Sequence, residues 1–147
     1  MEKMSTGLCN ALLDTGSLKS IFSGTTAELR IYSGTVPTTA DAAPATPTPI
    51  ATVLEPSAAY LNFASSASAG TIAKGTNAWT DPAPAGGVAT FYRLVLHADA
   101  NDSSATAKRI QGTIGVGGSD MNVGSTTIAA STPAFTVNTF TQSITPS

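Results

Sequence analysis

Charged residues are scarce in this sequence. Only 11% of its 147 residues are Asp, Glu, Lys or Arg, and the formal net charge is −2. Globular domains usually carry about a quarter charged residues, so this composition suits packing against neighbouring subunits better than a free cytosolic enzyme. The seven Lys and Arg residues are scattered along the chain and form no basic stripe. We therefore expect no nucleic-acid partner, because phosphate binding needs clustered cations.

The residue types that most often carry chemistry are also rare. The one cysteine, Cys9, excludes an internal disulfide, and its apolar neighbours predict a buried free thiol. The one histidine, His97, has Asp99 on its side of a predicted strand, but no nucleophile stands at a recognisable spacing. No G-x-S-x-G elbow occurs. We expect no catalytic residue and no small-molecule substrate.

Metal ligands do not gather at a working spacing. Asp99, Asn101 and Asp102 bring three oxygen side chains into one predicted hairpin loop. The later glycine and glutamate of a calcium loop are absent, so a solvated hairpin tip is the better interpretation. We expect no metal and no cofactor. Trp79 could stack on a sugar, but a single tryptophan without an aromatic cluster in sequence is expected to pack in a core.

Long apolar runs are missing as well. Near the start, an apolar segment is interrupted by Asn10 and ended by Asp14, which makes it a poor signal peptide. No segment approaches the length of a membrane span. We expect no membrane partner, and we expect the chain to fold in a reducing cytoplasm.

The first 22 residues predict a helical arm. Ser5 or Thr6 can cap a helix, apolar side chains recur at the i, i+3, i+4 spacing from Leu8 onward, and Gly16 can end it. A second apolar turn, LKSIF, follows before Ser-Gly-Thr-Thr breaks the pattern. Such an arm either covers one end of its own sheet or docks on a partner.

From residue 27 onward the apolar period is two, which is typical of strands. The segment AELRIYS places its leucine and isoleucine on one face and Glu28, Arg30 and Tyr32 on the other, so one face should meet water. Residues 36–50 contain four prolines and predict an exposed, irregular or polyproline-like loop. Loops of this length tend to be either mobile or ordered by a neighbour.

Further short apolar runs, separated by proline, serine and glycine, predict the other strands: IATVL, AYLNF, GTIAKG, VATFYRLVLHA, KRIQGTIGV, STTIAAS and AFTVNTFTQSI. The run VATFYRLVLHA is apolar on both faces, which marks a central strand, and it should pair antiparallel with KRIQGTIGV. In the last run the apolar parity changes, which predicts a bulge near Asn138. The segment NAWTDPAPAGG reads as a turn-rich connection.

These patterns predict an all-β fold, an antiparallel β-sandwich or jelly roll with a short N-terminal helix. We expect an N-terminal helical arm over residues 1–24 and a β-sandwich domain over residues 25–147. The alternation predicts the following core residues: Leu29, Ile31, Tyr92, Leu94 and Leu96.

The segment LRIYSGTVPTTADAAPATPTPIATV resembles a recurrent pattern in small structural proteins of tailed bacteriophages. The pattern is a strand ending in IYSG, a proline, an Ala-Asp-Ala-Ala tract and an LAT-like strand start. Later pieces are similar to further parts of it in the same order: ASSASAGTIAKGTNAW, ATFYRLV and GTIGVGGSDMNVGSTTIAAST. The similarity covers roughly residues 27 to 145, and this chain departs from it in IAT for LAT and in its richer proline content at 44–49.

The resemblance implies a non-enzymatic virion component, assembled in the host cytoplasm. A capsid decoration (cement) protein that bridges capsid subunits is the first expectation. A neck, collar or tail accessory that contacts a host-surface glycan is the alternative. The implied partners are the major capsid protein or other virion subunits, and we expect a homo-oligomer.

We expect the arm and the proline-rich segment to contact neighbouring virion subunits. The arm has more apolar side chains than one helical stripe buries, and the loop should lack hydrogen-bonding partners of its own. Proline also lowers the entropy that an extended segment loses on binding. The expected interface residues are Leu8, Leu12, Leu13, Leu18, Ile21, Phe22, Val36, Pro37, Pro44, Pro47, Pro49 and Ile50.

Overall fold

The main sheet is built around long antiparallel strands. The computed structural model describes residues 1–147 except 15, 23–25, 56–59, 132 and 144–147. The sheet has the order β1-β8-β7-β2-β3, formed by β1 (Lys3–Met4), β8 (Ile110–Gly115), β7 (Phe91–Leu96), β2 (Ala27–Tyr32) and β3 (Ala51–Val53). A further strand, β9 (Met121–Asn122), pairs with β8 in parallel. The antiparallel pairing of β7 with β8 and the central position of β7 confirm the sequence prediction.

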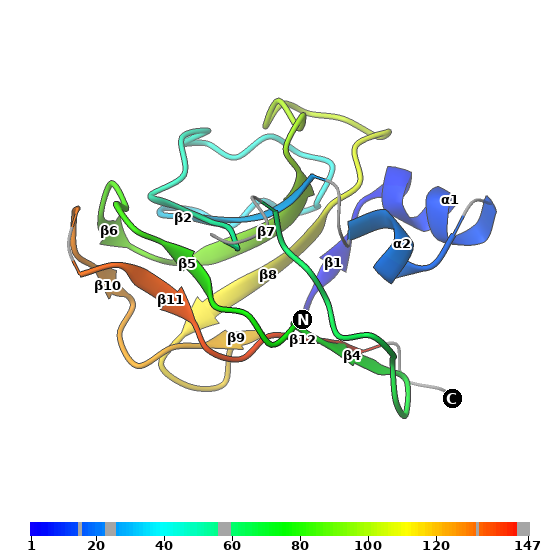
Figure 1. The fold of residues 1–147 in the computed structure, drawn as a ribbon. Coiled ribbons are helices and arrows are strands. Elements are labelled where there is room, and N and C mark those ends of the chain that lie inside the picture. Colours follow the sequence, from blue (N-terminus) through cyan, green and yellow to red (C-terminus); the bar gives the residue numbers. More distant parts are fainter. Residues whose placement is uncertain (15, 23–25, 56–59, 132, 144–147) are drawn as a thin grey trace.

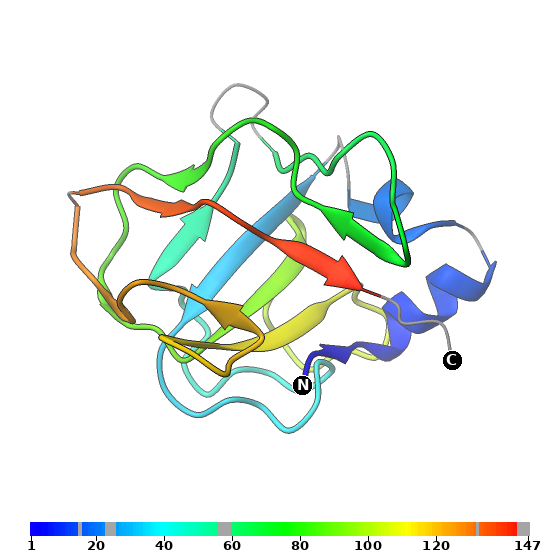
Figure 2. The same ribbon diagram turned by 90° about the horizontal axis from the view of Figure 1, so that it is seen from below.

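A second layer of short strand pairs lies across the main sheet (Figures 1 and 2). It consists of β4 (Thr71–Ala73) with β12 (Thr141–Ser143), β5 (Trp79–Asp81) with β11 (Phe135–Val137), and β6 (Gly87–Val88) with β10 (Thr127–Ile128). These pairs are antiparallel, and a bridge between Leu54 and Thr80 joins β5 to the end of β3. The fold is therefore all-β and sandwich-like, as the sequence predicts.

An aromatic cluster fills the space between the two layers. The ring of Trp79 is fully buried, with its centroid 5.5 Å from that of Phe63 and 5.4 Å from that of Phe140. Tyr92 reaches the cluster from the main sheet, and its ring centroid lies 5.7 Å from that of Phe140. The expected core position of Trp79 is confirmed, so its ring has no free face for a sugar.

Period-two alternation also places the aliphatic core correctly. Leu29, Ile31 and Leu94 are fully buried between the layers, together with Tyr92. Leu96 is half-buried at the margin and packs against the same core. Burial of side chains of this size contributes roughly 1.5–3 kcal/mol each.

Strands β1, β5 and β9 form where the sequence indicated none. β5 lies inside the predicted turn-rich connection, because Trp79 turns into the core there. The carboxylate of Asp81 also accepts a hydrogen bond from the backbone N–H of Thr52 at 2.8 Å, which holds β5 beside β3.

The predicted strand AYLNF is wrong over its described residues, 60–63. Only Phe63 has strand-like pairing, through an isolated bridge to Lys74. The backbone N–H of Asn62 instead donates to the buried carboxylate of Glu55 at 3.1 Å. The Glu55 side chain therefore takes the place of a neighbouring strand as the acceptor for this N–H.

The last strand changes its partner where the apolar parity changes. β11 pairs with β5 and ends at Val137, whereas β12 pairs with β4 and begins at Thr141. Val137 and Phe140 are both buried although they differ in parity. The irregularity predicted near Asn138 is present as a break between two strands rather than as a bulge.

The N-terminal arm contains α1 (Thr6–Asp14) and α2 (Leu18–Phe22). Ser5 caps α1 as predicted, because its Oγ accepts the backbone N–H of Leu8 at 3.2 Å. Cys9 is exposed, so the expectation of a buried thiol is wrong. The helix buries the face that carries Leu8, and the next residue turns toward solvent.

The arm shares its sheet and its core with the rest of the chain. β1 is an edge strand of the main sheet, and Leu8, Leu18 and Phe22 belong to the same hydrophobic core as Leu29. The described residues of the arm and of the sandwich therefore pack together. Through these three side chains the arm covers its own sheet, which is one of the two predicted alternatives.

Candidate functional site

The face of the main sheet that turns away from the aromatic cluster carries buried charges. Arg30, Arg93 and Gln111 lie side by side across β2, β7 and β8, and Arg109 precedes β8. All four side chains are buried. We call Arg30, Arg93 and Arg109 the arginine layer.

The prediction that this face meets water is therefore wrong. Glu28, Arg30 and Tyr32 are all buried. The reason is tertiary: residues 33–50 and 97–109, the cyan and yellow-green segments of Figure 1, fold over the face. We call residues 33–50 the proline-rich loop and residues 97–109 the hairpin loop.

Three buried side chains and the half-buried Asn101 hold the proline-rich loop through its main-chain carbonyls. Four side-chain N–H groups donate to carbonyl oxygens of the loop: Gln111 Nε2 to that of Pro37 (2.8 Å), Arg109 Nη1 to Ala40 (3.3 Å), Arg93 Nη2 to Ala42 (2.6 Å) and Asn101 Nδ2 to Pro47 (2.9 Å). The expectation that this loop lacks hydrogen-bonding partners is wrong. Because the contacts are to carbonyl groups, they fix the path of the main chain without using side chains of the loop.

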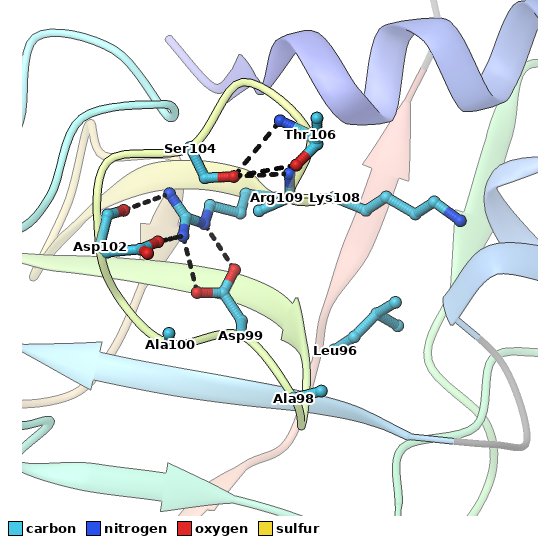
Figure 3. Close-up of a pocket in the computed structure, with 10 residues that line it drawn as sticks. Leu96, Ala98, Asp99, Ala100, Asp102, Ser104, Thr106, Lys108 and Arg109 are labelled. Carbon is cyan, nitrogen blue, oxygen red and sulfur yellow. Dashed lines mark hydrogen bonds and ion pairs between the residues drawn. The ribbon is translucent and has the colours of Figure 1, made fainter.

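The hairpin loop is held by a bidentate ion pair (Figure 3). Arg109 donates from Nε to Asp99 Oδ2 at 2.5 Å and from Nη2 to Oδ1 at 2.8 Å, and its Nη1 donates to the Asp102 carbonyl at 2.9 Å. Burial alone would raise the pKa of Asp99, but the hydrogen bonds from Arg109 and from the Asn101 N–H hold that pKa below its usual value.

Asp99 is not part of a solvated hairpin tip, because its side chain is only 3% exposed. Asp102 does face solvent. A cavity of about 330 Å³ lies beside the ion pair and is bordered by residues of the same loop, including Asp99, Ser104 and Lys108. In Figure 3 Lys108 extends away from the carboxylates. The polar groups at this cavity thus serve the loop itself.

Arg93 is the buried arginine without a carboxylate contact among the described residues. Its Nε and Nη2 donate to Gln111 Oε1 at 3.0 and 2.7 Å, and within the described residues its Nη1 has no hydrogen-bond partner. Burial, and then the neighbouring charge of Arg109, lower the pKa of Arg93. Sequence reasoning missed this residue, although an arginine inside the apolar run FYRLVL indicates a buried charge that needs acceptors.

His97 pairs with a different carboxylate from the expected one. Its Nδ1 lies 3.0 Å from Glu28 Oε2, while Asp99 binds Arg109 instead. Glu28 also binds Arg30 in an ion pair, and the imidazole is 63% exposed. Among the described residues, no hydroxyl or thiol is hydrogen-bonded to His97. The geometry is that of an exposed imidazole hydrogen-bonded to a buried carboxylate just after β7.

The expected interface residues fall into two groups. Leu8, Leu18, Phe22, Pro37, Pro44 and Ile50 are buried in the chain's own structure, so their side chains are not available to a partner. Leu13 and Pro47 are exposed, and Leu12, Ile21, Val36 and Pro49 are half-buried. The interface itself stays a prediction, now limited to the second group.

A groove opens between α2 and the strand pair β4–β12. It has a volume of about 390 Å³, and its walls include Met4, Leu18, Ile72 and Gln142. Lys19 is the charged residue among its described lining residues. We call this hollow the apolar groove.

The fold and the site define a small all-β domain in which buried charges hold two surface loops. In the part of the chain that the structure describes, no three His, Cys, Asp or Glu side chains are grouped to hold a metal ion. The helices in that same part are too short or too polar to span a bilayer. Comparison of the chain with protein-family models, curated proteins and solved structures finds no match.

Proposed function

We propose that this chain is a non-enzymatic structural subunit of a tailed-bacteriophage particle, and that it acts as a capsid decoration (cement) protein between capsid subunits. The observation that carries the proposal is the proline-rich loop, whose main chain is held by buried side chains. A loop fixed before binding loses little entropy when a neighbour covers it, which suits a lasting contact.

The chemistry of the loop surface supports a protein contact. Asp41 is the only charged residue of the proline-rich loop, and its carboxylate accepts the N–H and hydroxyl of Thr6 at 2.9 and 2.6 Å. The exposed residues of this loop are threonine, alanine, proline and glycine, and none of them is charged. Such a surface can pack closely against a neighbouring subunit without burying an unpaired charge.

The use of the charged residues supports a structural role rather than a chemical one. Arg109 and Asp99 pair with each other, and Glu28 is bound by Arg30 and His97. These groups bind one another, and Arg30 and Arg109 also donate to main-chain carbonyls of the hairpin loop. The accessible interface residues of the arm and loop can join a standard contact of roughly 800 Å² per partner.

The copy number of the chain in purified particles tests the proposal. Quantitative peptide mass spectrometry should find many copies per particle, in a fixed ratio to the major capsid protein. A few copies per particle would favour the alternative, a neck, collar or tail accessory. Absence from particles would overturn both.

A matched pair of variants tests the role of the loop. Ala45 lies exposed in the proline-rich loop, and Ala129 lies exposed beside β10. Ala45→Asp should reduce the number of copies per particle because it places an unpaired charge in the contact, whereas Ala129→Asp should not. Equal incorporation of both variants would contradict the assignment of the loop.

A further inference from the structure

The arm that lines the apolar groove also carries an exposed apolar side chain. Leu13, in the last turn of α1, is 85% exposed, the largest exposure among the described large hydrophobic residues after Met1. A single exposed leucine is ordinary in a monomer. Here it stands only a short turn before α2, whose Leu18 and Lys19 line the groove.

The charges beside these two features are complementary. Asp14 follows Leu13 and is exposed, and it forms no ion pair within the described residues. Lys19, at the groove, donates to the carbonyl of Ser65 and likewise has no carboxylate partner among the residues that the structure describes. The exposed Leu13, with the negative charge of Asp14 beside it, thus complements the apolar groove, which has the positive charge of Lys19 at its wall.

The elements that carry Leu13 and the apolar groove lie on the same side of the fold, and this arrangement favours a twofold contact. α1 and α2 lie together at the right of Figure 1, and β4 and β12 lie below them. When complementary features lie on one side of a molecule, a twofold axis lets each copy offer its Leu13 to the other, and the contact closes. Burial of a leucine side chain from both copies adds apolar area twice.

We propose that two copies of this chain form a twofold dimer in which Leu13 of each copy occupies the apolar groove of the other. Asp14 of each copy then lies against Lys19 of the other. The inference goes beyond the proposed virion role, because it concerns a contact between two copies of the chain and holds whatever particle they join.

Sedimentation of the isolated protein over a range of concentrations tests the dimer. Wild type should convert from monomer to dimer as concentration rises, and Leu13→Asp should weaken the dimer about tenfold or more. Val116→Asp is the matched control, since Val116 is exposed at a distant turn and should leave the dimer unchanged. A wild-type chain that stays monomeric to millimolar concentration would overturn the inference.

A charge exchange tests the arrangement. Asp14→Lys and Lys19→Asp should each weaken the dimer several-fold, and the double variant should restore it, because the pair is then reversed. Failure of the double variant to recover would overturn the assignment. The double variant also controls for the hydrogen bond that Lys19→Asp removes from Ser65.

The single thiol reports the location of the contact. Cys9 lies four residues before Leu13, on the same face of α1, and is exposed. Alkylation of Cys9 by a maleimide should be slower in the dimer than in the monomer. An equal rate in both states would place the dimer contact elsewhere and contradict the proposal. Because these assays use the isolated chain, their failure leaves the particle copy number as a separate test.

Discussion

Asp99 and Arg109 form the ion pair that fixes the hairpin loop on the main sheet. The pKa of Asp99 is lower in the folded chain than its ordinary value of 3.8. The pair therefore contributes its full stability above pH 3.8, and that contribution is lost as the pH falls through the folded pKa. Asp99→Asn should lower the free energy of unfolding at pH 7 by about 3–5 kcal/mol, because it leaves the Arg109 charge buried without a partner.

Urea unfolding between pH 2 and pH 7 measures this effect. The variant should lose less stability than wild type on acidification, since the Asp99 titration is gone. Asp102→Asn is the control: Asp102 is 67% exposed and lies 3.5 Å from the same guanidinium, so its removal should change stability by less than about 1 kcal/mol. Equal effects of the two variants would contradict the assigned role of Asp99.

The two fully buried arginines should respond differently to the same substitution. Arg109→Met leaves the buried carboxylate of Asp99 unpaired, whereas Arg93→Met removes a charge that has no carboxylate contact among the described residues. We expect Arg109→Met to be the more destabilising, with a loss of about 3–5 kcal/mol. Urea unfolding at pH 7 measures both, and a larger loss for Arg93→Met would refute this ranking.

At the scale of elements, α1 touches the hairpin loop through a glycine. A Cβ on Gly7 would lie 2.2 Å from the Thr106 carbonyl oxygen and 2.4 Å from its carbon. Alanine ordinarily stabilises a helix interior by about 1 kcal/mol relative to glycine. Gly7→Ala should instead destabilise the fold by about 1–3 kcal/mol, because two backbones must separate.

Thermal unfolding measures the change, and Gly117→Ala is its control. A Cβ on Gly117 would meet nothing within 4 Å. Its substitution should shift stability by no more than about 0.5 kcal/mol. A gain in stability for Gly7→Ala would show that α1 does not pack on the hairpin loop as described.

The elements that the sequence predicts correctly are those fixed by local pattern. Alternation identifies Leu29 and Leu94 as core residues because a strand turns successive side chains to opposite faces. The cap at Ser5 follows from its hydroxyl, which can bond the third N–H of the helix. These signals depend on near neighbours alone.

The candidate site depends on contacts that no local pattern reports. Alternation assigns Arg30 to solvent because it cannot detect a loop that folds over the sheet from elsewhere in the chain. The proline-rich loop looked unsupported for the same reason, since its donors, Arg93 and Gln111, lie more than fifty residues away in sequence. The clue that was available is an arginine at the centre of an apolar strand.

At the scale of the whole molecule, the arm is a structural part of the sandwich. Its Glu2 carboxylate accepts hydrogen bonds from the hydroxyl of Tyr92 in the main sheet and from Gln142 in the second layer, the latter at 2.6 Å. Removal of residues 1–22 would delete β1, remove the Glu2 acceptor from both donors and open the core where Leu8 and Phe22 pack. We expect the shortened chain to lack a cooperative thermal transition.

Circular dichroism at increasing temperature measures this, with Leu13→Asp as a control that alters the arm only at its surface. At a concentration where the wild-type chain is monomeric, Leu13→Asp should melt within a few degrees of wild type, on the order of 0.5 kcal/mol in stability. If the shortened chain melted cooperatively at the wild-type temperature, the arm would be an appendage and its place in the core would be wrong.

The buried side chains Arg93, Arg109 and Gln111 hold the proline-rich loop in a single shape before any partner binds. Backbone ¹⁵N relaxation of the isolated protein tests this claim directly at residues 38–43. We expect order parameters of about 0.85 there, equal to those of the central strands, and a fall centred on Ala42 when Arg93→Met and Gln111→Met are combined, since Arg109 still holds Ala40. Wild-type order parameters below about 0.6 in the loop would contradict the claim.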